Sequence, residues 1–430
     1  MRKIILIISL LSISIIGYAQ VGHVMQGIGS VNMTMGGAAT GMPADINGAL
    51  QWNPAAISVF NESILSVNGG LFFSSPELSS SVMDTSGNTF SGTTEDDRGT
   101  SILPSIGFVM GKEESAHALG ISAFGISGFG VTFPESTTNP INLPQNANGF
   151  GRVESNYQLL QVALTYAYEI NEHLSIGIAP TLGYATLELE PNPLAVPSQT
   201  LGYPVSDVAD AIGFGGQIGL YFKAGDGFSA GVSYKSVQSF SEFDFDSKYL
   251  DGSDAPQIEF QMDYPAIYSV GIGYTTEDFD VAIDYRLIDY ESTEGFKASG
   301  WEIADSGPMA GFPTGAVKGF GWENVSVVSF GLQFRGVEKL PFRIGYTYSS
   351  NPINENLAFF SVPATAIIAH AFQLGLGYEA NEMITVNTGF HYGMSDGKTS
   401  GLILNPRPQS FGGPWDAATN PLGAVPGSEV

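Results

Sequence analysis

The chain of 430 residues contains no cysteine, so its fold forms without disulfide bonds. Charged residues make up only 13% of it, and 16 Lys and Arg stand against 42 Asp and Glu. The formal net charge of −26 leaves no basic stripe to neutralise phosphates, which argues against nucleic acid as a partner. Two interpretations of the acidic excess stay open, a solvated acidic face and exposed loops that bind divalent cations near anionic lipid head groups.

The sequence also lacks an apolar run long enough for a transmembrane helix. The strongest run, residues 4–16, is too short, follows two basic residues and precedes Gly-Tyr-Ala with small residues at the cleavage positions. This pattern predicts a cleavable export signal over residues 1–19, with Gln20 as the first mature residue. Later apolar runs are interrupted by Gly, Ser, Thr or a charge, so a helical membrane protein is excluded.

Glycine and aromatic residues are abundant instead, with 54 Gly, 28 Phe and 18 Tyr. In residues 368–378 (IAHAFQLGLGY), large apolar or aromatic side chains alternate with small or polar ones, which predicts a strand with one apolar face. Strands that end in Tyr and Phe are typical of membrane-spanning β-barrels, whose aromatic residues lie at the two interfaces. The same alternation recurs at residues 162–170, 217–222, 281–287, 342–349 and 384–392.

The lengths of the connections between the predicted strands indicate the topology. Short polar turns alternate with long loops rich in Gly, Pro, Asn and Ser, as in a barrel that crosses the outer membrane. The fold class is therefore all-β, a transmembrane antiparallel β-barrel over residues 61–394. Thirteen strands are predicted, near residues 62–73, 101–111, 116–126, 153–170, 172–190, 210–224, 227–244, 256–276, 278–290, 324–337, 340–350, 368–380 and 382–394.

An odd number of strands is unusual, because bacterial single-chain barrels have an even number. Residues 395–430 are rich in Pro and Gly and form the last predicted long extracellular loop. We therefore expect the sequence to stop before a fourteenth, closing strand. The alternative is that residues 401–404 contribute a short closing strand.

Residues 20–60 precede the first strand and are predicted to fold into the lumen as a small helical hatch. Their small residues suit close packing there. The pattern resembles the hatch of the FadL/TodX family of outer-membrane transporters for hydrophobic compounds, and residues 343–348 (RIGYTY) resemble a later strand motif of that family. The hatch residues that carry the resemblance are Gly27-Ile28-Gly29-Ser30, Met35-Gly36-Gly37-Ala38, Asp45 and Trp52-Asn53-Pro54-Ala55.

The resemblance implies a monomeric 14-stranded barrel in the outer membrane of a Gram-negative bacterium, in contact with lipid and lipopolysaccharide. It implies passive uptake of a hydrophobic small molecule. Neither enzymatic activity nor a cofactor or metal is expected, because the five histidines are scattered without metal-ligand spacing. The ligand would be captured among the extracellular loops, pass to a pocket above the hatch and leave sideways through a kink in the third strand.

Residues 118–133 (ALGISAFGISGFGVTF) cover that third strand and its continuation. Gly125, Gly128 and Gly130 are the expected kink residues, because glycine occurs where strands bulge or bend. The alternative is that these glycines only begin a loop.

Aromatic residues near the kink and in the hatch are the expected ligand contacts. These are Phe124, Phe129 and Phe133 beside the kink, with Trp52 and Phe60 from the hatch, since an apolar ligand needs an apolar site with few polar anchors. Each could instead pack the barrel or belong to an interface girdle. The sequence shows no basic pair for a carboxylate, so fatty acids, hydrocarbons and aromatics all remain possible ligands.

The sequence also bears on two other functions, hydrolysis and protein docking. Residues 227–231 (GFSAG) match the nucleophile-elbow motif of hydrolases, but that motif requires a strand-to-helix turn, and here a tight turn enters a strand. The second is docking of exported proteins, as in PorV-like barrels of type IX secretion. Residues 291–323, with Trp301 and Trp322, form a loop long enough to bind a protein.

Overall fold

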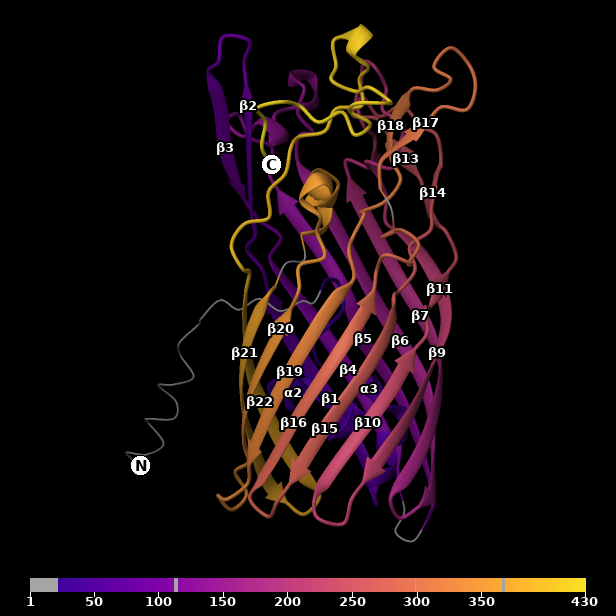
Figure 1. The fold of residues 1–430 in the computed structure, drawn as a ribbon, viewed down its shortest axis with the longest axis vertical. Helices are drawn as coiled ribbons and strands as arrows, with labels where there is room; N and C mark the ends of the chain where they lie inside the picture. Colours follow the sequence, from indigo (N-terminus) through magenta and orange to yellow (C-terminus); the bar gives the residue numbers. More distant parts are fainter. Residues whose placement is uncertain (1–21, 112–114, 298, 366–367) are drawn as a thin grey trace, which may run out of the picture.

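The computed structural model describes residues 22–111, 115–297, 299–365 and 368–430. These residues form an elongated cylinder of tilted antiparallel strands, with long loops gathered at one end and short turns at the other (Figure 1). The predicted export signal, residues 1–19, lies outside the described residues.

The main sheet contains 14 strands, of which one, β11 (Ser239–Phe240), pairs with β9 off the main order. Each neighbouring pair is antiparallel, and the predicted all-β barrel is confirmed. β1 and β22 stand at the two ends of the main order. In that order the strands are β1 (Ser63–Phe73), β4 (Thr100–Met110), β5 (His117–Phe133), β6 (Val153–Asn171), β7 (Leu174–Glu190), β9 (Ala209–Lys223), β10 (Phe228–Lys235), β15 (Ala266–Thr275), β16 (Phe279–Asp289), β19 (Val325–Phe334), β20 (Phe342–Ser349), β21 (His370–Asn381) and β22 (Ile384–Met394).

The wall shows why the alternation in the sequence indicates strands. Along β6, Leu160, Leu164 and Tyr166 point outward and are exposed, whereas Gln161 and Thr165 point inward and are buried. Large apolar side chains face outward and small or polar ones face the lumen, which is the arrangement of a barrel in lipid.

Two predicted strands are shorter than expected. β10 ends at Lys235 rather than near residue 244, and β15 begins at Ala266 rather than near residue 256. The alternation continues past β10 because Phe240 and Phe243 bury their rings in the loop region, where one face of the chain is also covered. The alternation of buried and exposed residues therefore continues beyond Lys235, where the wall strand β10 ends.

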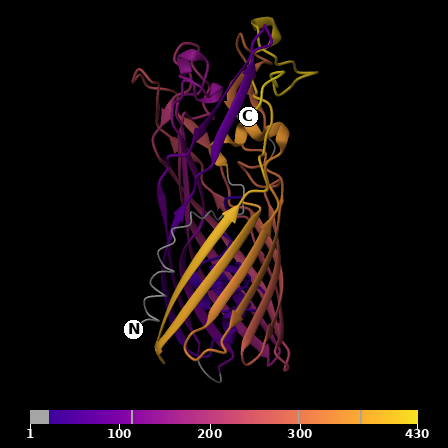
Figure 2. The same cartoon turned by 90° about the vertical axis from the view of Figure 1, so that its left-hand side faces the viewer.

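The long loops contain secondary structure of their own, and β5 extends past its predicted end near residue 126 as far as Phe133. Near the chain's C-terminal end, residues 401–404 lie among these loops, where the Gly401 amide donates to Val430. Residues 395–430 lie across the loop end of the barrel (Figure 2). The loop elements are β2 (Glu77–Met83) with β3 (Thr89–Glu95), β8 (Val205–Ser206) with β13 (Ser247–Lys248), β12 (Phe243–Phe245) with β14 (Ile258–Phe260), β17 (Trp301–Ile303) with β18 (Pro313–Val317), and the 3-10 helices η2 (Pro140–Asn142), η3 (Gln145–Ala147), η4 (Glu355–Ala364) and η5 (Gln409–Phe411).

Residues 22–60, called here the hatch segment, fold inside the cylinder (Figures 1 and 2). They form α2 (Gly29–Thr34), α3 (Ile46–Trp52) and η1 (Pro54–Val59). α2 contacts β20, β21, β22 and β1, and η1 contacts β5, β6, β7 and β9, so the segment reaches across the lumen. Within the four described ranges, no helix is both long and apolar enough to cross a membrane.

Glycines of the wall make room for the hatch segment. A Cβ atom on Gly219 would lie 2.0 Å from Asn53 Oδ1, and one on Gly231 would lie 1.9 Å from the Thr40 carbonyl oxygen. On Gly177 it would lie 2.3 Å from the Ala55 nitrogen. Part of the high glycine content is therefore explained by the close approach of two backbones.

Asn53 fixes the hatch segment to the wall. Its Nδ2 donates to the Thr40 carbonyl at 2.9 Å and the Leu220 carbonyl at 3.0 Å, and its Oδ1 accepts from the Ala55 amide at 3.1 Å. The side chain thus caps η1 and joins it to β9.

We expect Asn53→Ala to destabilise the hatch segment by about 2–4 kcal/mol, because three hydrogen bonds are lost and each contributes roughly 0.5–1.5 kcal/mol. Hydrogen exchange of the backbone amides in residues 46–59 measures this. The control is Asn171→Ala. It removes the side-chain oxygen that accepts from the His173 and Leu174 amides in an exposed turn, and it should leave the exchange of residues 46–59 unchanged. Wild-type exchange in Asn53→Ala would contradict the assigned role.

Candidate functional site

The barrel wall opens between β4 and β5. Their pairing runs from Met110 opposite Leu119 to Ser105 opposite Phe124. Beyond that point β4 continues to pair with β1, and β5 continues to pair with β6 as far as Phe133. The two strands therefore part from each other in the half of the wall nearer the loops.

β5 has a register shift at the place where it leaves β4. Gly125 pairs with Leu160 and Ser127 with Leu159, so Ile126 is an extra residue in the strand. Ile126 is fully buried and its carbonyl accepts from the Met25 amide at 2.9 Å. A bulge of this kind bends a strand and redirects its side chains.

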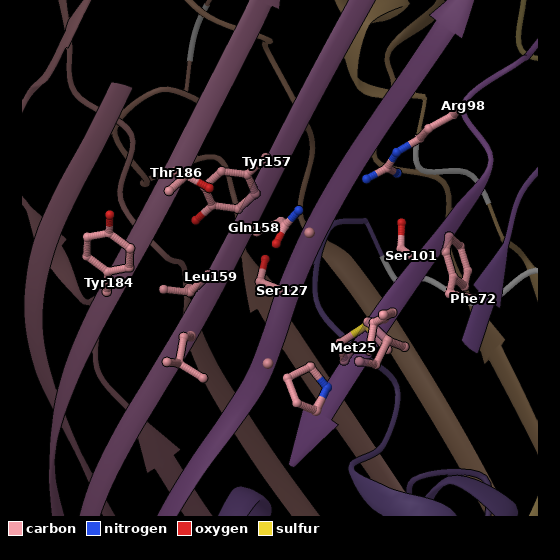
Figure 3. Close-up of a pocket in the computed structure, with 16 residues that line it drawn as sticks. Met25, Phe72, Arg98, Ser101, Ser127, Tyr157, Gln158, Leu159, Tyr184 and Thr186 are labelled. Carbon is pink, nitrogen blue, oxygen red and sulfur yellow. The ribbon is translucent and has the colours of Figure 1, made fainter. Parts of the chain in front are cut away.

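A cavity of about 180 Å³, the lateral cavity, occupies this opening (Figure 3). Phe72, Ser101 and Arg98 lie on one side of it, and Tyr157 and Tyr184 on the other. Gly125 and Gly128 also line it, so the backbone of the bulge forms part of its surface. Its lining includes the outward-facing residues Ile102 and Leu160, which connects the cavity with the lipid-facing side of the wall.

The start of the hatch segment covers the bulge from inside. Val24 forms a β-bridge with Ser127, and the His23 carbonyl accepts from the Gly128 amide at 3.0 Å. The His23 ring stacks on Phe296, with ring centroids 4.7 Å apart. Met25 lines the lateral cavity, so the hatch segment supplies part of its inner wall.

A larger cavity of about 460 Å³, the upper cavity, lies among the loops. Phe72 and Arg98 line both the upper and the lateral cavity, so the two adjoin at these side chains. Residues 74–79 and 393–395, with Gly130, form further parts of its wall.

A third, smaller space of about 50 Å³ is the aromatic loop pocket. Its lining includes Phe150, Tyr203, Trp301 and Phe359, which come from four different loops. Burial raises the pKa of the Tyr203 phenol, and its hydroxyl donates to the Gly315 carbonyl at 2.6 Å. The pocket therefore presents a neutral, aromatic surface.

Charged side chains lie deeper, between the hatch segment and the wall. Asp284 Oδ2 accepts from the Ala39 and Thr40 amides, both at 2.8 Å, and from Arg286 Nη2 at 2.7 Å. The Arg286 guanidinium carbon lies 3.8 Å from the centre of the Trp52 ring. All these side chains are buried, and they tie the hatch segment to β16.

The five aromatic residues predicted to contact ligand are mostly packing residues in this structure. Trp52, Phe124, Phe129 and Phe133 are each at most 2% exposed, and Phe60 is partly buried. Phe129 stacks on Tyr157, with centroids 5.1 Å apart. None of the five lines one of the three cavities described above. A role for them in ligand binding stays a prediction.

The three predicted kink glycines lie at the cavities. Gly125 and Gly128 line the lateral cavity and Gly130 lines the upper cavity. A Cβ atom on Gly130 would lie 2.6 Å from the guanidinium carbon of Arg98, so a larger residue there would displace Arg98.

Sequence reasoning did not single out Arg98, Met25 or Tyr157, which line the lateral cavity. Arg98 is one of only 16 basic residues, which is the one signal that could have drawn attention to it. Nothing in the sequence near Met25 or Tyr157 marks either residue as part of a cavity. Met25 reaches β5 only through a contact between distant parts of the chain, its amide donating to the Ile126 carbonyl.

The nucleophile-elbow match is a strand in the structure. Ser229 lies in β10, paired with Gly273 of β15 and Lys223 of β9, and no helix follows it. The strand-to-helix turn that exposes a nucleophilic serine is therefore not formed here.

Comparison with known proteins identifies the family. The family model described as outer membrane protein transport protein (OMPP1/FadL/TodX) matches residues 22–402. The chain belongs to this family. The predicted resemblance is confirmed, and membership places the protein in the outer membrane of a Gram-negative bacterium. Members are transport proteins rather than enzymes, as the sequence had indicated.

Solved structures show the same fold at low sequence identity. The P. putida toluene transporter TodX has a TM-score of 0.61 and 17% identity, over 88% of this chain and 94% of TodX. A Pseudomonas aeruginosa FadL homologue has a TM-score of 0.64 and 12% identity, over 91% and 94%. The Ralstonia pickettii toluene transporter TbuX has a TM-score of 0.57 and 18% identity, over 86% and 94%. None of the curated proteins compared with the chain matches it in sequence.

Proposed function

We propose that this barrel takes up hydrophobic small molecules and releases them sideways, through the lateral cavity, into the lipid of the outer membrane. The observation that supports this most strongly is the divergence of β4 and β5 at the Gly125–Ser127 register shift. The cavity there reaches Leu160 and Tyr184, which are 40% and 47% exposed on the outer face of the wall.

A lateral route suits the chemistry of the cargo. The free energy of an apolar molecule is lower against an apolar protein surface than in a water-filled pore. The helices of the hatch segment occupy the lumen toward the short turns (Figure 1), whereas the lateral cavity reaches the outward-facing Ile102 and Leu160. The aromatic loop pocket and the upper cavity are suitable places for capture before this step.

The substrate class follows from the family in outline. TodX and TbuX are described as toluene transporters, and another structural relative as a FadL homologue. We include aromatics, hydrocarbons and long-chain fatty acids in the proposal. One chain supplies the whole opening, so the proposal requires only a monomer.

Docking of an exported protein has less support. The Trp301 indole donates to the Leu422 carbonyl at 2.8 Å, and the Trp322 indole donates to Ser361 Oγ at 3.2 Å. Both rings are buried by other parts of the same chain, at 4% and 1% exposure. They stabilise the loops and do not present an apolar surface to a partner.

Native ligand content tests the proposal. The protein is purified from outer membranes in mild detergent, and an organic extract is analysed by mass spectrometry. We expect a stoichiometric apolar compound in the wild type and less of it in a variant whose lateral cavity is filled. An empty barrel that instead retains an exported protein at stoichiometric amounts would contradict transport and support docking.

A further inference from the structure

The lateral cavity lies where the outer face of the wall changes from polar to apolar. Outward-facing residues that pair across β6, β7 and β9 mark this change in two successive rows. The row nearer the loops, called here the polar row, consists of Gln158, Thr186 and Asp210. The next row toward the short turns, called the apolar row, consists of the exposed residues Leu160, Tyr184 and Ile212. Such a change, with Tyr at the boundary, is typical of the level where lipid hydrocarbon meets head groups.

Residues of both rows line the lateral cavity. Gln158 and Thr186 come from the polar row, and Leu160 and Tyr184 from the apolar row. Figure 3 shows Gln158, Thr186 and Tyr184 on neighbouring strands at one side of the cavity. We propose that Gln158 and Thr186 bind the neutral, hydrogen-bonding head group of an amphiphilic ligand, while its apolar chain enters the lipid along the apolar row. This inference rests on the proposed function and specifies the substrate class as uncharged amphiphiles such as long-chain alcohols.

The polar row offers hydrogen bonds to a ligand at this point. Gln158 Nε2 donates to Asn156 Oδ1 at 3.3 Å, while Gln158 Oε1 and the Thr186 hydroxyl have no protein partner among the described residues. Residues directly opposite each other on paired strands have Cβ atoms about 4.5–5.5 Å apart, so one head group reaches both. A ligand hydroxyl can donate to the amide oxygen of Gln158 and accept from the hydroxyl of Thr186.

The charges around the opening favour a neutral head group over an anion. Arg98 is the charged residue of the described lining, and it already interacts electrostatically with the carboxylates of Asp96 and Glu154. Further carboxylates lie on the outer face beside the polar row, Asp210 within it and Glu188 one step nearer the loops. These negative charges repel a carboxylate and leave an uncharged hydroxyl unaffected.

Three probes with the same chain length test the inference. Radiolabelled dodecane, 1-dodecanol and dodecanoate are bound at neutral pH to the purified barrel in detergent, with protein-free micelles as the reference for partition. We expect the wild type to bind 1-dodecanol about tenfold more tightly than dodecane, because hydrogen bonds to the polar row are added. It should also bind 1-dodecanol more tightly than dodecanoate.

The double variant Gln158→Leu, Thr186→Val removes the hydrogen-bonding groups and nearly conserves side-chain size. It should bind 1-dodecanol and dodecane equally, with the affinity for dodecane unchanged, since both positions lie on the outer face of the wall. The matched control is Thr100→Val. Thr100 is an exposed threonine at the loop end of β4 that does not line the lateral cavity, so this variant should keep the wild-type preference.

Different failures have different meanings. If the double variant keeps the preference for 1-dodecanol over dodecane, or if the wild type has none, the head-group site is wrong while uptake of apolar molecules stands. Tighter binding of dodecanoate than of 1-dodecanol by the wild type would also overturn the inference. If the wild type binds none of the three probes, the proposed function itself fails. Should the double variant not fold, Thr186→Val alone decides, because it should lose part of the preference.

Discussion

Replacing Gly125 with phenylalanine is expected to lower uptake of an apolar substrate by about tenfold or more, while the barrel still folds. Gly125 lines the lateral cavity, and a Cβ atom there would meet only Pro104, at 3.7 and 3.8 Å, which is ordinary van der Waals contact. The added ring can therefore fill the cavity without forcing the backbone apart. A barrier raised by as little as about 1.4 kcal/mol slows passage tenfold.

Uptake of a radiolabelled hydrocarbon by cells that express each variant measures this effect. The control is Gly216→Phe, at another glycine of the wall, where a Cβ atom would lie 3.6 Å from the Ala179 carbonyl oxygen. This position lies on β9, away from the lateral cavity, and should give wild-type uptake. Wild-type uptake by Gly125→Phe, with the barrel folded, would show that substrate does not pass this cavity.

A second large effect is expected at the buried ion pair between the hatch segment and β16. Asp284→Ala removes the acceptor of the Ala39 and Thr40 amides and leaves the Arg286 guanidinium buried without its carboxylate. Breaking such a pair by removing one partner costs about 3–5 kcal/mol. We expect the hatch segment to detach from β16 in this variant, although the strands remain paired.

Conductance of single barrels in planar bilayers reports on this detachment, because a detached hatch segment leaves an aqueous lumen. Asp284→Ala should show larger ion conductance than the wild type. Asp278→Ala is the control, since Asp278 is an exposed residue of the short turn that precedes β16. Equal conductance in Asp284→Ala and the wild type would contradict an anchoring role for Asp284.

The wall could be predicted from the sequence because lipid imposes a regular pattern on it. Outward residues such as Leu164 must be apolar and inward ones such as Thr165 must suit the lumen, so each strand carries its own period of two. The break after Lys235 could not be predicted this way, because Phe240 in the loop is buried as well and prolongs the same pattern.

Less of the candidate site could be predicted from the sequence, because contacts between residues far apart in the chain form it. Glycines near residues 125–130 indicated where β5 departs from regular pairing, since a missing side chain is a local property. Which aromatic ring faces a cavity is not local: Phe129 packs against Tyr157, which the sequence places 28 positions away. Ser127 meets His23 across 104 positions, and no nearby residue signals that contact.

The lateral route is tested most directly by locking the hatch segment to the wall. The hydroxyl oxygens of Ser58 in η1 and Ser175 in β7 lie 2.8 Å apart, and the natural chain has no cysteine to interfere. In the double variant Ser58→Cys, Ser175→Cys, a disulfide formed by oxidation would hold the hatch segment in place. Uptake of an apolar substrate is then compared between the oxidised and reduced protein. Lateral release predicts the same rate in both states, whereas loss of uptake on oxidation and its return on reduction would show that substrate passes through the hatch segment instead.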